Sequence, residues 1–228
     1  MEPSISLSHV SKRYSMPGGR HVDGLLDVSL SVARGQFVSI QGPSGSGKTT
    51  LLLTIGGMQR PTSGQVVVAG HDLYSLGQAK RTKFRAAHLG FVFQMFHLVP
   101  YLNVIENICL GAAGQADARQ HAQALIEQLG LTDRQQHRPS HLSVGECQRT
   151  ALARALIACP DIILADEPTG NLDPDNTAEV LQVLTNFCHK GGAVLLVSHG
   201  EEAHRLADRV LRIEQGRIEE FPKSQIGR

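Results

Sequence analysis

The strongest constraint on the fold of this chain is a glycine-rich stretch at residues 42–49, which reads Gly-Pro-Ser-Gly-Ser-Gly-Lys-Thr. It matches the Gly-x-x-x-x-Gly-Lys-Ser/Thr pattern, and it lies between a strand expected at Phe37–Gln41 and a helix expected to begin near Lys48. Glycines let the backbone turn so that successive N–H groups face one anion, and the helix N-terminus adds the positive end of a dipole. A glycine-rich turn with a chance Lys-Thr is the alternative, which the strand–loop–helix context disfavours. The sequence therefore predicts a phosphate-binding loop made of Gly42, Pro43, Ser44, Gly45, Ser46, Gly47, Lys48, Thr49 and Thr50.

Two acidic residues follow a second apolar run. Residues 162–165 are continuously apolar, as expected of a central parallel strand, and Asp166 and Glu167 come directly after them. Ligands of open α/β sheets collect at this carboxyl edge, although an acid pair at a strand end is by itself more often only solvated. Beside a phosphate loop, Lys48 would reach the β- and γ-phosphates of a nucleotide, and Thr49 and Asp166 would hold Mg²⁺. Glu167 would then polarise an attacking water as a general base.

Strand and helix patterns alternate along most of the chain, which is typical of an α/β fold. Alternating apolar residues from Leu26 to Val32 predict a half-buried antiparallel strand. From about Asn103 to Cys159 only helices are expected, so we predict an α/β core with an antiparallel β subdomain at residues 1–94 and 160–228 and an inserted helical subdomain at residues 95–159. Further strands are expected at residues 5–10, 66–69, 91–93, 161–166, 193–198, 210–213 and 217–219, and helices at 144–158, 175–190 and 201–207.

Composition narrows the classes of function. The 22 Lys and Arg balance 21 Asp and Glu, which argues against a dedicated nucleic-acid binder. The apolar runs are far shorter than the roughly 20 residues of a membrane helix, and no signal peptide is expected at the N-terminus. The chain has four cysteines, which form no Cys-x-x-Cys pair: Cys109, Cys147, Cys159 and Cys188. They therefore indicate reduced thiols in a cytosolic protein, with neither a disulfide framework nor a zinc site.

A further helix is expected to begin after Leu142. Ser143 and Glu146 have the spacing of a capping box, which would make this an ordinary helix start. A serine hydroxyl and a glycine amide at a helix N-terminus also suit a phosphate. Spacing alone does not decide between the two interpretations.

Taken together, these motifs resemble the nucleotide-binding subunit of an ATP-binding cassette (ABC) transporter, in the family's order and over nearly the whole chain. The resemblance implies a RecA-like P-loop NTPase core that binds ATP and Mg²⁺. Residues 142–146 resemble the Leu-Ser-Gly-Gly-Gln signature, which in the family binds the γ-phosphate of ATP held by the opposite subunit. Four further positions match family motifs: Tyr14 the aromatic that stacks on adenine, Gln94 the glutamine that contacts Mg²⁺ or water, Asp173 the D-loop, and His199 the switch histidine at the γ-phosphate.

Each of these matches has a plainer alternative. Tyr14 could be a packing aromatic, Gln94 a surface residue and His199 a structural histidine, while Asp173 before Pro174 is also a good helix N-cap. The chain departs from the family pattern where Val144 replaces a signature glycine, Glu146 the signature glutamine and Gly200 the common aspartate. Because Val144 would lie at the first helical position, where φ is negative, we expect the signature to work, through Ser143, Val144, Gly145 and Glu146.

The resemblance implies an ATPase that acts as a pair of copies and drives a separately encoded transmembrane permease, without a nucleic-acid partner. Residues 166–173 resemble the branch with the lipoprotein-releasing, macrolide-export and cell-division cassettes, many of which move periplasmic parts of a permease by mechanotransmission. The chain would then lie peripherally at the cytoplasmic face of the inner membrane, with the apolar residues among 94–101 as the docking segment. Packing of Met95, Phe96 and Leu98 in the subunit's own core is the alternative for this segment. A nucleotide-gated regulatory subunit with little turnover and a soluble ABC ATPase remain alternative functions.

Overall fold

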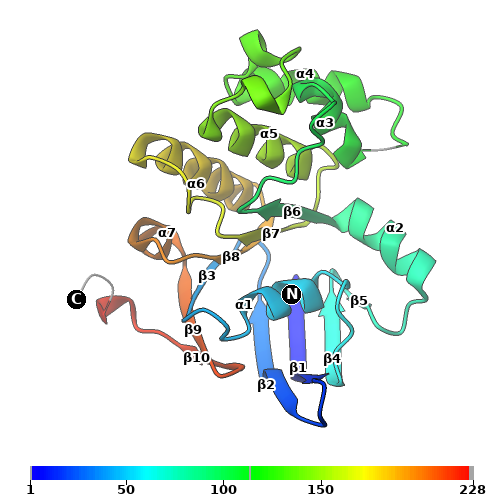
Figure 1. The fold of residues 1–228 in the computed structure, drawn as a ribbon, viewed down its shortest axis with the longest axis vertical. Coiled ribbons are helices and arrows are strands. Elements are labelled where there is room, and N and C mark those ends of the chain that lie inside the picture. Colours follow the sequence, from blue (N-terminus) through cyan, green and yellow to red (C-terminus); the bar gives the residue numbers. More distant parts are fainter. Residues whose placement is uncertain (1, 113, 226–228) are drawn as a thin grey trace.

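The computed structural model describes residues 2–112 and 114–225 and contains two β-sheets and a helical lobe (Figure 1). The strands are β1 (Ile5–Ser15), β2 (His21–Val32), β3 (Phe37–Gln41), β4 (Ser63–Val68), β5 (His71–Asp72), β6 (Leu89–Phe93), β7 (Ile162–Asp166), β8 (Ala193–Val197), β9 (Arg209–Glu214) and β10 (Arg217–Glu220). The α-helices are α1 (Lys48–Ile55), α2 (Gln78–His88), α3 (Val104–Cys109), α4 (Ala118–Gln128), α5 (Val144–Leu156), α6 (Pro174–His189) and α7 (Glu201–Leu206). Short 3₁₀ helices lie at Leu110–Ala112, Thr132–Arg134, Pro139–His141 and Lys223–Gln225.

The larger sheet has the strand order β10-β9-β3-β8-β7-β6 and is parallel except for the β9–β10 pair. Its central strands β7 and β8 are buried on both faces, as their continuous apolar runs predict. Val197 pairs with both Ile40 and Asp166, and Asp166 pairs with Phe93. The carboxyl ends of β3, β8, β7 and β6 therefore meet at one edge of the sheet.

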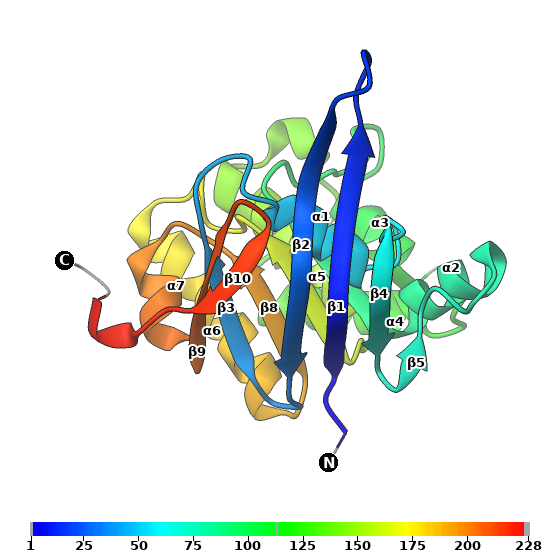
Figure 2. The same cartoon turned by 90° about the horizontal axis from the view of Figure 1, so that it is seen from below.

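The smaller sheet is antiparallel, with the order β2-β1-β4-β5, which confirms the antiparallel strand predicted from Leu26 to Val32. It lies in front of α1 in Figure 2. Buried side chains of α1, among them Leu51 and Ile55, join strands of both sheets in one hydrophobic core. This core fixes the direction in which the loop before α1 leaves β3.

The described residues between 95 and 159 contain helices and no strand. Their apolar side chains form a separate core, to which Ile105, Ile126 and Ala153 contribute from α3, α4 and α5. On its other side α5 buries Leu152 against apolar residues of the larger sheet and of α6. The lobe thus touches the sheet through α5.

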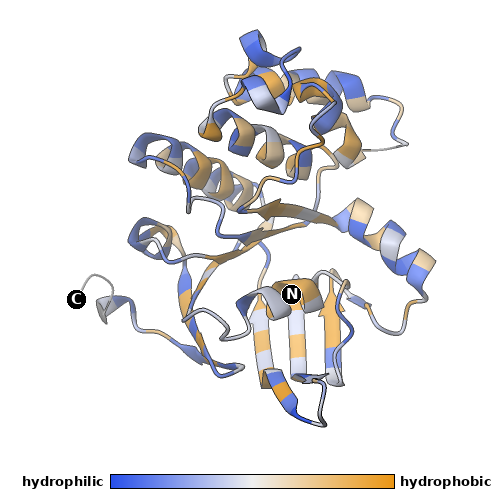
Figure 3. Cartoon of the chain, viewed as in Figure 1, coloured by the Kyte–Doolittle hydropathy of each residue, from blue (hydrophilic) through white to orange (hydrophobic). Residues whose placement is uncertain are grey.

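The sequence patterns assign no element between residues 70 and 90, where the structure has α2. Figure 3 shows the apolar strands of the larger sheet beside the largely hydrophilic α2. Phe84 is the one buried residue of α2 and most of its neighbours in the helix are charged or polar, so the helix offers few apolar residues by which to recognise it. No helix among the described residues is both long and apolar enough to cross a membrane.

Candidate active site

The predicted phosphate loop connects β3 to α1, and two of its glycines are required by close contacts. Gly47 has φ of 112°, and a Cβ atom there would lie 2.1 Å from the Gly24 carbonyl oxygen of β2. A Cβ atom at Gly42 would lie 2.1 Å from the Ile213 carbonyl oxygen of β9. The loop is therefore pressed between strands of the two sheets, where a residue with a side chain does not fit.

The loop encloses polar groups with spare hydrogen-bonding capacity. The Lys48 ammonium donates to the carbonyl oxygens of Gly42 (2.6 Å) and Pro43 (2.9 Å). The buried hydroxyl of Ser46 has no hydrogen-bond partner in the described chain. A buried unpartnered hydroxyl and a lysine folded back on its own loop both fit an anion bound by this loop.

Thr49 and Asp166 lie together although they are far apart in the sequence. The Thr49 hydroxyl donates to Asp166 Oδ2 over 3.1 Å. A hydroxyl and a carboxylate are hard oxygen ligands of the kind that Mg²⁺ prefers, and Mg²⁺ on a nucleotide takes its other ligands from phosphates and water. The described residues hold no cluster of three or more His, Cys, Asp or Glu with metal-binding geometry. The pair thus fits a Mg²⁺ ion bound together with a nucleotide, and not an all-protein metal site.

Glu167 and His199 face each other at the ends of β7 and β8. Glu167 has φ of 48°, and its amide donates to the Val197 carbonyl oxygen (2.9 Å). This backbone conformation ends β7 and keeps Glu167 at the edge of the sheet. Its carboxylate accepts from the His199 amide (3.3 Å) and lies 3.4 Å from His199 Nε2. Burial raises the pKa of Glu167, while His199 and Lys48 act in the opposite direction. A raised pKa suits a carboxylate that accepts a proton.

Two other predicted residues flank this edge. The Tyr14 hydroxyl lies 3.1 Å from Oγ1 of Thr50, the last residue of the predicted phosphate-binding stretch. The Lys12 ammonium lies 5.3 Å from the Tyr14 ring centroid. The ring is half-buried, so packing and base stacking are both compatible with its position. Gln94 is exposed directly after β6, and a Cβ atom at Gly170 would lie 3.2 Å from its Nε2. Gln94 therefore lies beside the loop that follows Glu167.

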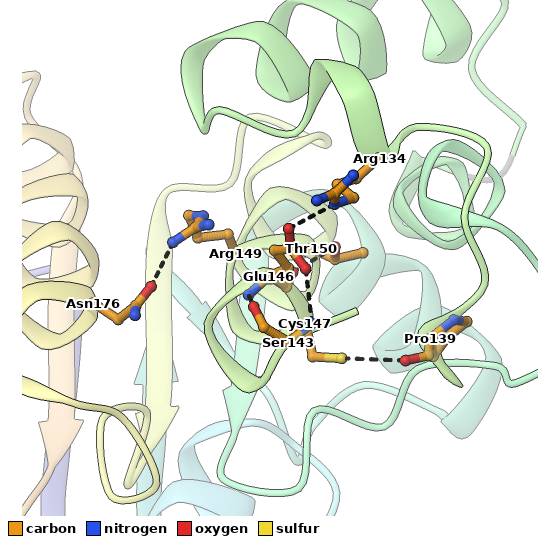
Figure 4. Close-up of polar contacts among 8 residues, drawn as sticks. All are labelled: Arg134, Pro139, Ser143, Glu146, Cys147, Arg149, Thr150 and Asn176. Carbon is orange, nitrogen blue, oxygen red and sulfur yellow. Dashed lines mark hydrogen bonds and ion pairs between the residues drawn. The ribbon is translucent and has the colours of Figure 1, made fainter. Parts of the chain in front are cut away.

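The predicted signature lies at the start of α5, in the helical lobe (Figure 4). Ser143 Oγ accepts from the Glu146 amide (3.2 Å), and Glu146 accepts from the Ser143 amide (2.7 Å), so the capping box is present. Glu146 also pairs with Arg134 Nε at 2.8 Å. The Ser143 amide first, and then Arg134, lower the pKa of Glu146. Val144 leaves 48% of its surface exposed at the tip of the helix.

Sequence analysis did not predict the contact between the start of α5 and the start of α6, where Asp173 lies. A Cβ atom at Gly145 would lie 2.2 Å from Asn176 Oδ1, and that oxygen accepts from Arg149 at 2.6 Å. Asn176 also donates to Asp173 through its amide group and its backbone N–H, and Asp173 caps α6 with Pro174 at N1 as predicted. The spacing of Asp173 and Asn176 was the one available signal, and it indicates only a helix cap.

The structure thus gathers one group of predicted residues and leaves another apart. Gly42, Lys48, Thr49, Asp166, Glu167 and His199 are linked around the sheet edge. Hydrogen bonds and ion pairs of the described chain do not connect Ser143 or Gly145 to this group. The expected docking segment is divided: Met95 and Tyr101 are 72% and 71% exposed, whereas Phe96 and Leu98 are half-buried.

Known proteins resemble this chain along nearly its full length. The model of the ABC transporter family matches residues 25–170. Lipoprotein-releasing system ATP-binding protein LolD of Coxiella burnetii is 41% identical, over 95% of this chain and 95% of that protein. Macrolide export ATP-binding/permease protein MacB 2 of Aeromonas hydrophila is 39% identical, over 96% of this chain but only 34% of that protein. The chain therefore spans about a third of the length of its MacB relatives.

The fold agrees with these relatives. A dimeric structure of the ATP-binding cassette MJ0796, in a post-hydrolysis state bound to ADP and Pi, superimposes with a TM-score of 0.89 at 35% identity, covering 96% of this chain and 98% of that one. Together with the family match over more than half of the residues, this shows that the chain belongs to the ABC transporter family.

Proposed function

We propose that this chain is the ATP-hydrolysing subunit of an ABC transporter. The observation that carries the proposal is the arrangement at the sheet edge, where Glu167 faces His199 beside the lysine of a glycine-constrained phosphate loop. A half-buried carboxylate with a raised pKa, next to a phosphate loop, is the arrangement that in-line attack of water on a γ-phosphate requires.

Each residue of this edge has a role in the proposal. Lys48 leaves its own carbonyls to bind the β- and γ-phosphates, and the loop amides hold the remaining oxygens. Thr49 and Asp166 would hold Mg²⁺, which supplies positive charge to the phosphates when bound. Glu167 accepts the proton of the attacking water. The supporting positions are Tyr14 at the base, Gln94 at the attacking water or the metal, and His199 at the γ-phosphate.

A second copy of the chain completes the site. Ser143, Val144, Gly145 and Glu146 begin a helix in the other lobe, and the N-terminus of such a helix is suited to a phosphate. Because the capping box occupies the amides of Ser143 and Glu146 and not those of Val144 and Gly145, amides remain for a phosphate of the partner's ATP. The dimeric cassettes of similar fold support an arrangement of two copies. In this proposal Asp173 lies at the same interface.

A transmembrane permease is the proposed partner, on the cytoplasmic face of the cell membrane. A groove of about 320 Å³ lies between α2, β6 and α5 and is lined by Phe91, Phe93 and Leu110. Exposed Met95 follows β6 at the same place. A cytoplasmic helix of the permease would bury these apolar surfaces. The names of the LolD and MacB relatives favour lipoprotein release or export over import.

The purified chain tests this function through Glu167→Gln. We expect MgATP hydrolysis to fall by about 10²–10⁴-fold, because the general base is lost. ATP binding should persist and hold two copies together, which size-exclusion chromatography with MgATP would detect. Glu219→Gln, an exposed carboxylate on β10, is the matched control and should keep the parent rate. Hydrolysis near the parent rate by Glu167→Gln would show that another group acts as the base.

A further inference from the structure

Arg154 binds the loop between β6 and α3 rather than a carboxylate. Its guanidinium donates to the carbonyl oxygens of Phe96 and His97, at 2.6 Å each. No ion pair of the described chain includes Arg154, although the side chain is half-buried and burial lowers its pKa. A half-buried charge whose partners are two adjacent carbonyls fixes the backbone that carries them.

The backbone at this point is held in an uncommon conformation. Phe96 and His97 have φ of 54° and 48°, in the left-handed region that residues with side chains seldom adopt. Such residues persist where surrounding contacts determine them. Here the contacts include the two bonds from Arg154, the edge-to-face packing of His97 on Phe93, and a backbone bond from the Phe96 amide to the Phe93 carbonyl oxygen (3.1 Å).

A second buried side chain holds the far end of the same loop. Asn107 of α3 is fully buried, accepts from the Val99 amide (2.7 Å) and donates to the carbonyls of Val99 and Leu102. Exposed Met95 comes directly before the residues that Arg154 holds, and exposed Tyr101 lies between Val99 and Leu102, which Asn107 holds. The loop thus presents apolar side chains from a fixed backbone.

Arg154 lies in the last turn of α5, the helix that begins at the capping box of Ser143. Arg154 and Ser143 are therefore about 16 Å apart along the axis of one continuous helix. Figure 1 shows the loop between β6 and α3 passing α5 on its way to the helical lobe. A displacement of the loop would therefore act on the same helix that carries Ser143.

We propose that Arg154 is a positioning residue that makes the exposed loop and the start of α5 move as one body. The inference rests on the proposed function, in which the loop contacts the permease and the start of α5 contacts the partner's ATP. Arginine is suited to this connection because its planar fork reaches two carbonyls at once, whereas the lysine ammonium is a flexible point charge. Arg154→Lys therefore keeps the charge and loosens the link.

Spin labels at each end of the link test the connection directly. Met95→Cys and Val144→Cys, in a chain that also carries Cys109→Ser and Cys159→Ser, provide the two labelling sites. Double electron–electron resonance measures their distance distribution without nucleotide. We expect a narrow distribution in the parent chain and one about twofold broader with Arg154→Lys, because the fork is lost. An equal width in both chains would overturn the proposal.

Arg81→Lys is the matched control. Arg81 also donates to two backbone carbonyls, those of Gly57 and Leu76 at 2.9 Å each, but these lie away from the labelled loop. This variant should leave the distance distribution narrow; a broadening equal to that of Arg154→Lys would reveal general loosening of the fold and overturn the proposal. Should Arg154→Lys not fold, Phe96→Pro imposes φ near −65° and moves the accepting carbonyl while leaving α5 intact. It should broaden the distribution in the same way.

Hydrolysis by the unlabelled chain separates positioning from a purely structural role. With Arg154→Lys we expect kcat to fall about fivefold and the affinity for a fluorescent ATP analogue to change less than about twofold, because the phosphate loop is untouched. A broadened distribution with unchanged kcat would show that the link does not reach the site, and would overturn the proposal. A parent chain that does not hydrolyse ATP would instead refute the proposed function, while the label distances would still test the link.

Discussion

The phosphate loop and the start of α5 are the two anion sites that we propose at helix N-termini, but they are built differently. The phosphate loop has no side-chain cap on α1, a buried serine hydroxyl without a partner and a lysine bound only to its own loop. The start of α5 is already capped by the reciprocal hydrogen bonds of Ser143 and Glu146, and Arg134 pairs with Oε1 of Glu146. The phosphate loop thus has hydrogen-bond donors that are free to bind an anion, whereas the capping box already satisfies some of the backbone amides at the start of α5.

This difference agrees with the different roles that we propose for the two sites. A loop shaped by close backbone contacts can hold a nucleotide within one chain. A capped helix start offers a phosphate only the amides that the cap leaves, so it can add to a nucleotide held elsewhere and does not suffice alone. ATP would then favour the closed dimer only by the difference between its affinities for the closed and open states.

The proposed difference between the two sites would be wrong if each chain hydrolysed ATP alone. A mixed dimer tests this point, and it is the experiment with the largest expected effect. Pairing a Lys48→Ala chain with a Ser143→Arg chain places both lesions in one shared site and leaves the other intact. We expect either homodimer to lose hydrolysis by at least about 100-fold, because Lys48→Ala removes a charge from the phosphate loop and the long arginine side chain at position 143 obstructs the helix start. The mixed dimer should retain measurable turnover. Separately tagged chains purified in sequence allow the rates to be compared.

Equal inactivity of all three dimers would contradict a shared site, unless both sites must act together. Closure of the mixed dimer around MgATP, followed by size-exclusion chromatography, distinguishes these cases. A mixed dimer that closes but does not hydrolyse ATP would indicate two sites that act together. One that neither closes nor hydrolyses ATP would show that each site carries one lesion, so that the start of α5 serves the site of its own chain and not that of its partner.

The backbone nature of the first site predicts a smaller but clear effect of one methyl group. Gly47→Ala must move the Gly24 carbonyl and hold a φ of 112° that alanine rarely adopts. We expect MgATP affinity to fall about 30-fold, or about 2 kcal/mol, from strain of this kind. Gly45→Ala is the control: its φ is also positive, at 77°, but no atom lies within 4 Å of the added carbon. Calorimetric titration that finds equal losses for both variants would exclude the close contact as the cause.

The contrast between the sites also explains what the sequence could predict. The phosphate loop and Asp166 were predictable because local spacing fixes their place at the end of a strand, and buried strands such as β7 show as continuous apolar runs. The predicted capping box and Asp173 cap are present for the same reason: both are local. The contacts of Asn176 and Arg154 could not be predicted, because they join segments 27 and 57 or more residues apart. Helix α2 was missed because it is mostly polar and only Phe84 is buried in it, so it contains few apolar residues by which to recognise it.

The junction between Gly145 and Asn176 provides a test of the contact that sequence could not predict. Gly145→Ala would place a methyl group 2.2 Å from Asn176 Oδ1, and Arg149 and Asp173 hold that amide in place. We expect the free energy of unfolding to fall by about 1.5 kcal/mol, as in an overpacked site. In an Asn176→Ala background the same substitution should have a smaller effect. Urea unfolding of the four chains measures the coupling, and additive effects would show that the two residues do not press on each other.

The smallest effect concerns the charge that closes the start of α5. The pKa of Glu146 is lowered in the folded chain, so its charge stabilises the fold above the unfolded pKa of about 4.3 and this contribution is lost as pH falls through the folded pKa. Glu146→Gln should therefore reduce the free energy of unfolding by about 0.5 kcal/mol near pH 7, and by progressively less below about pH 4. Glu127→Gln, on exposed α4, is the control and should show no such change with pH. If urea unfolding gives the Glu146→Gln difference the same size at pH 7 and pH 3.5, the hydrogen bond to Ser143 and not the charge closes the helix.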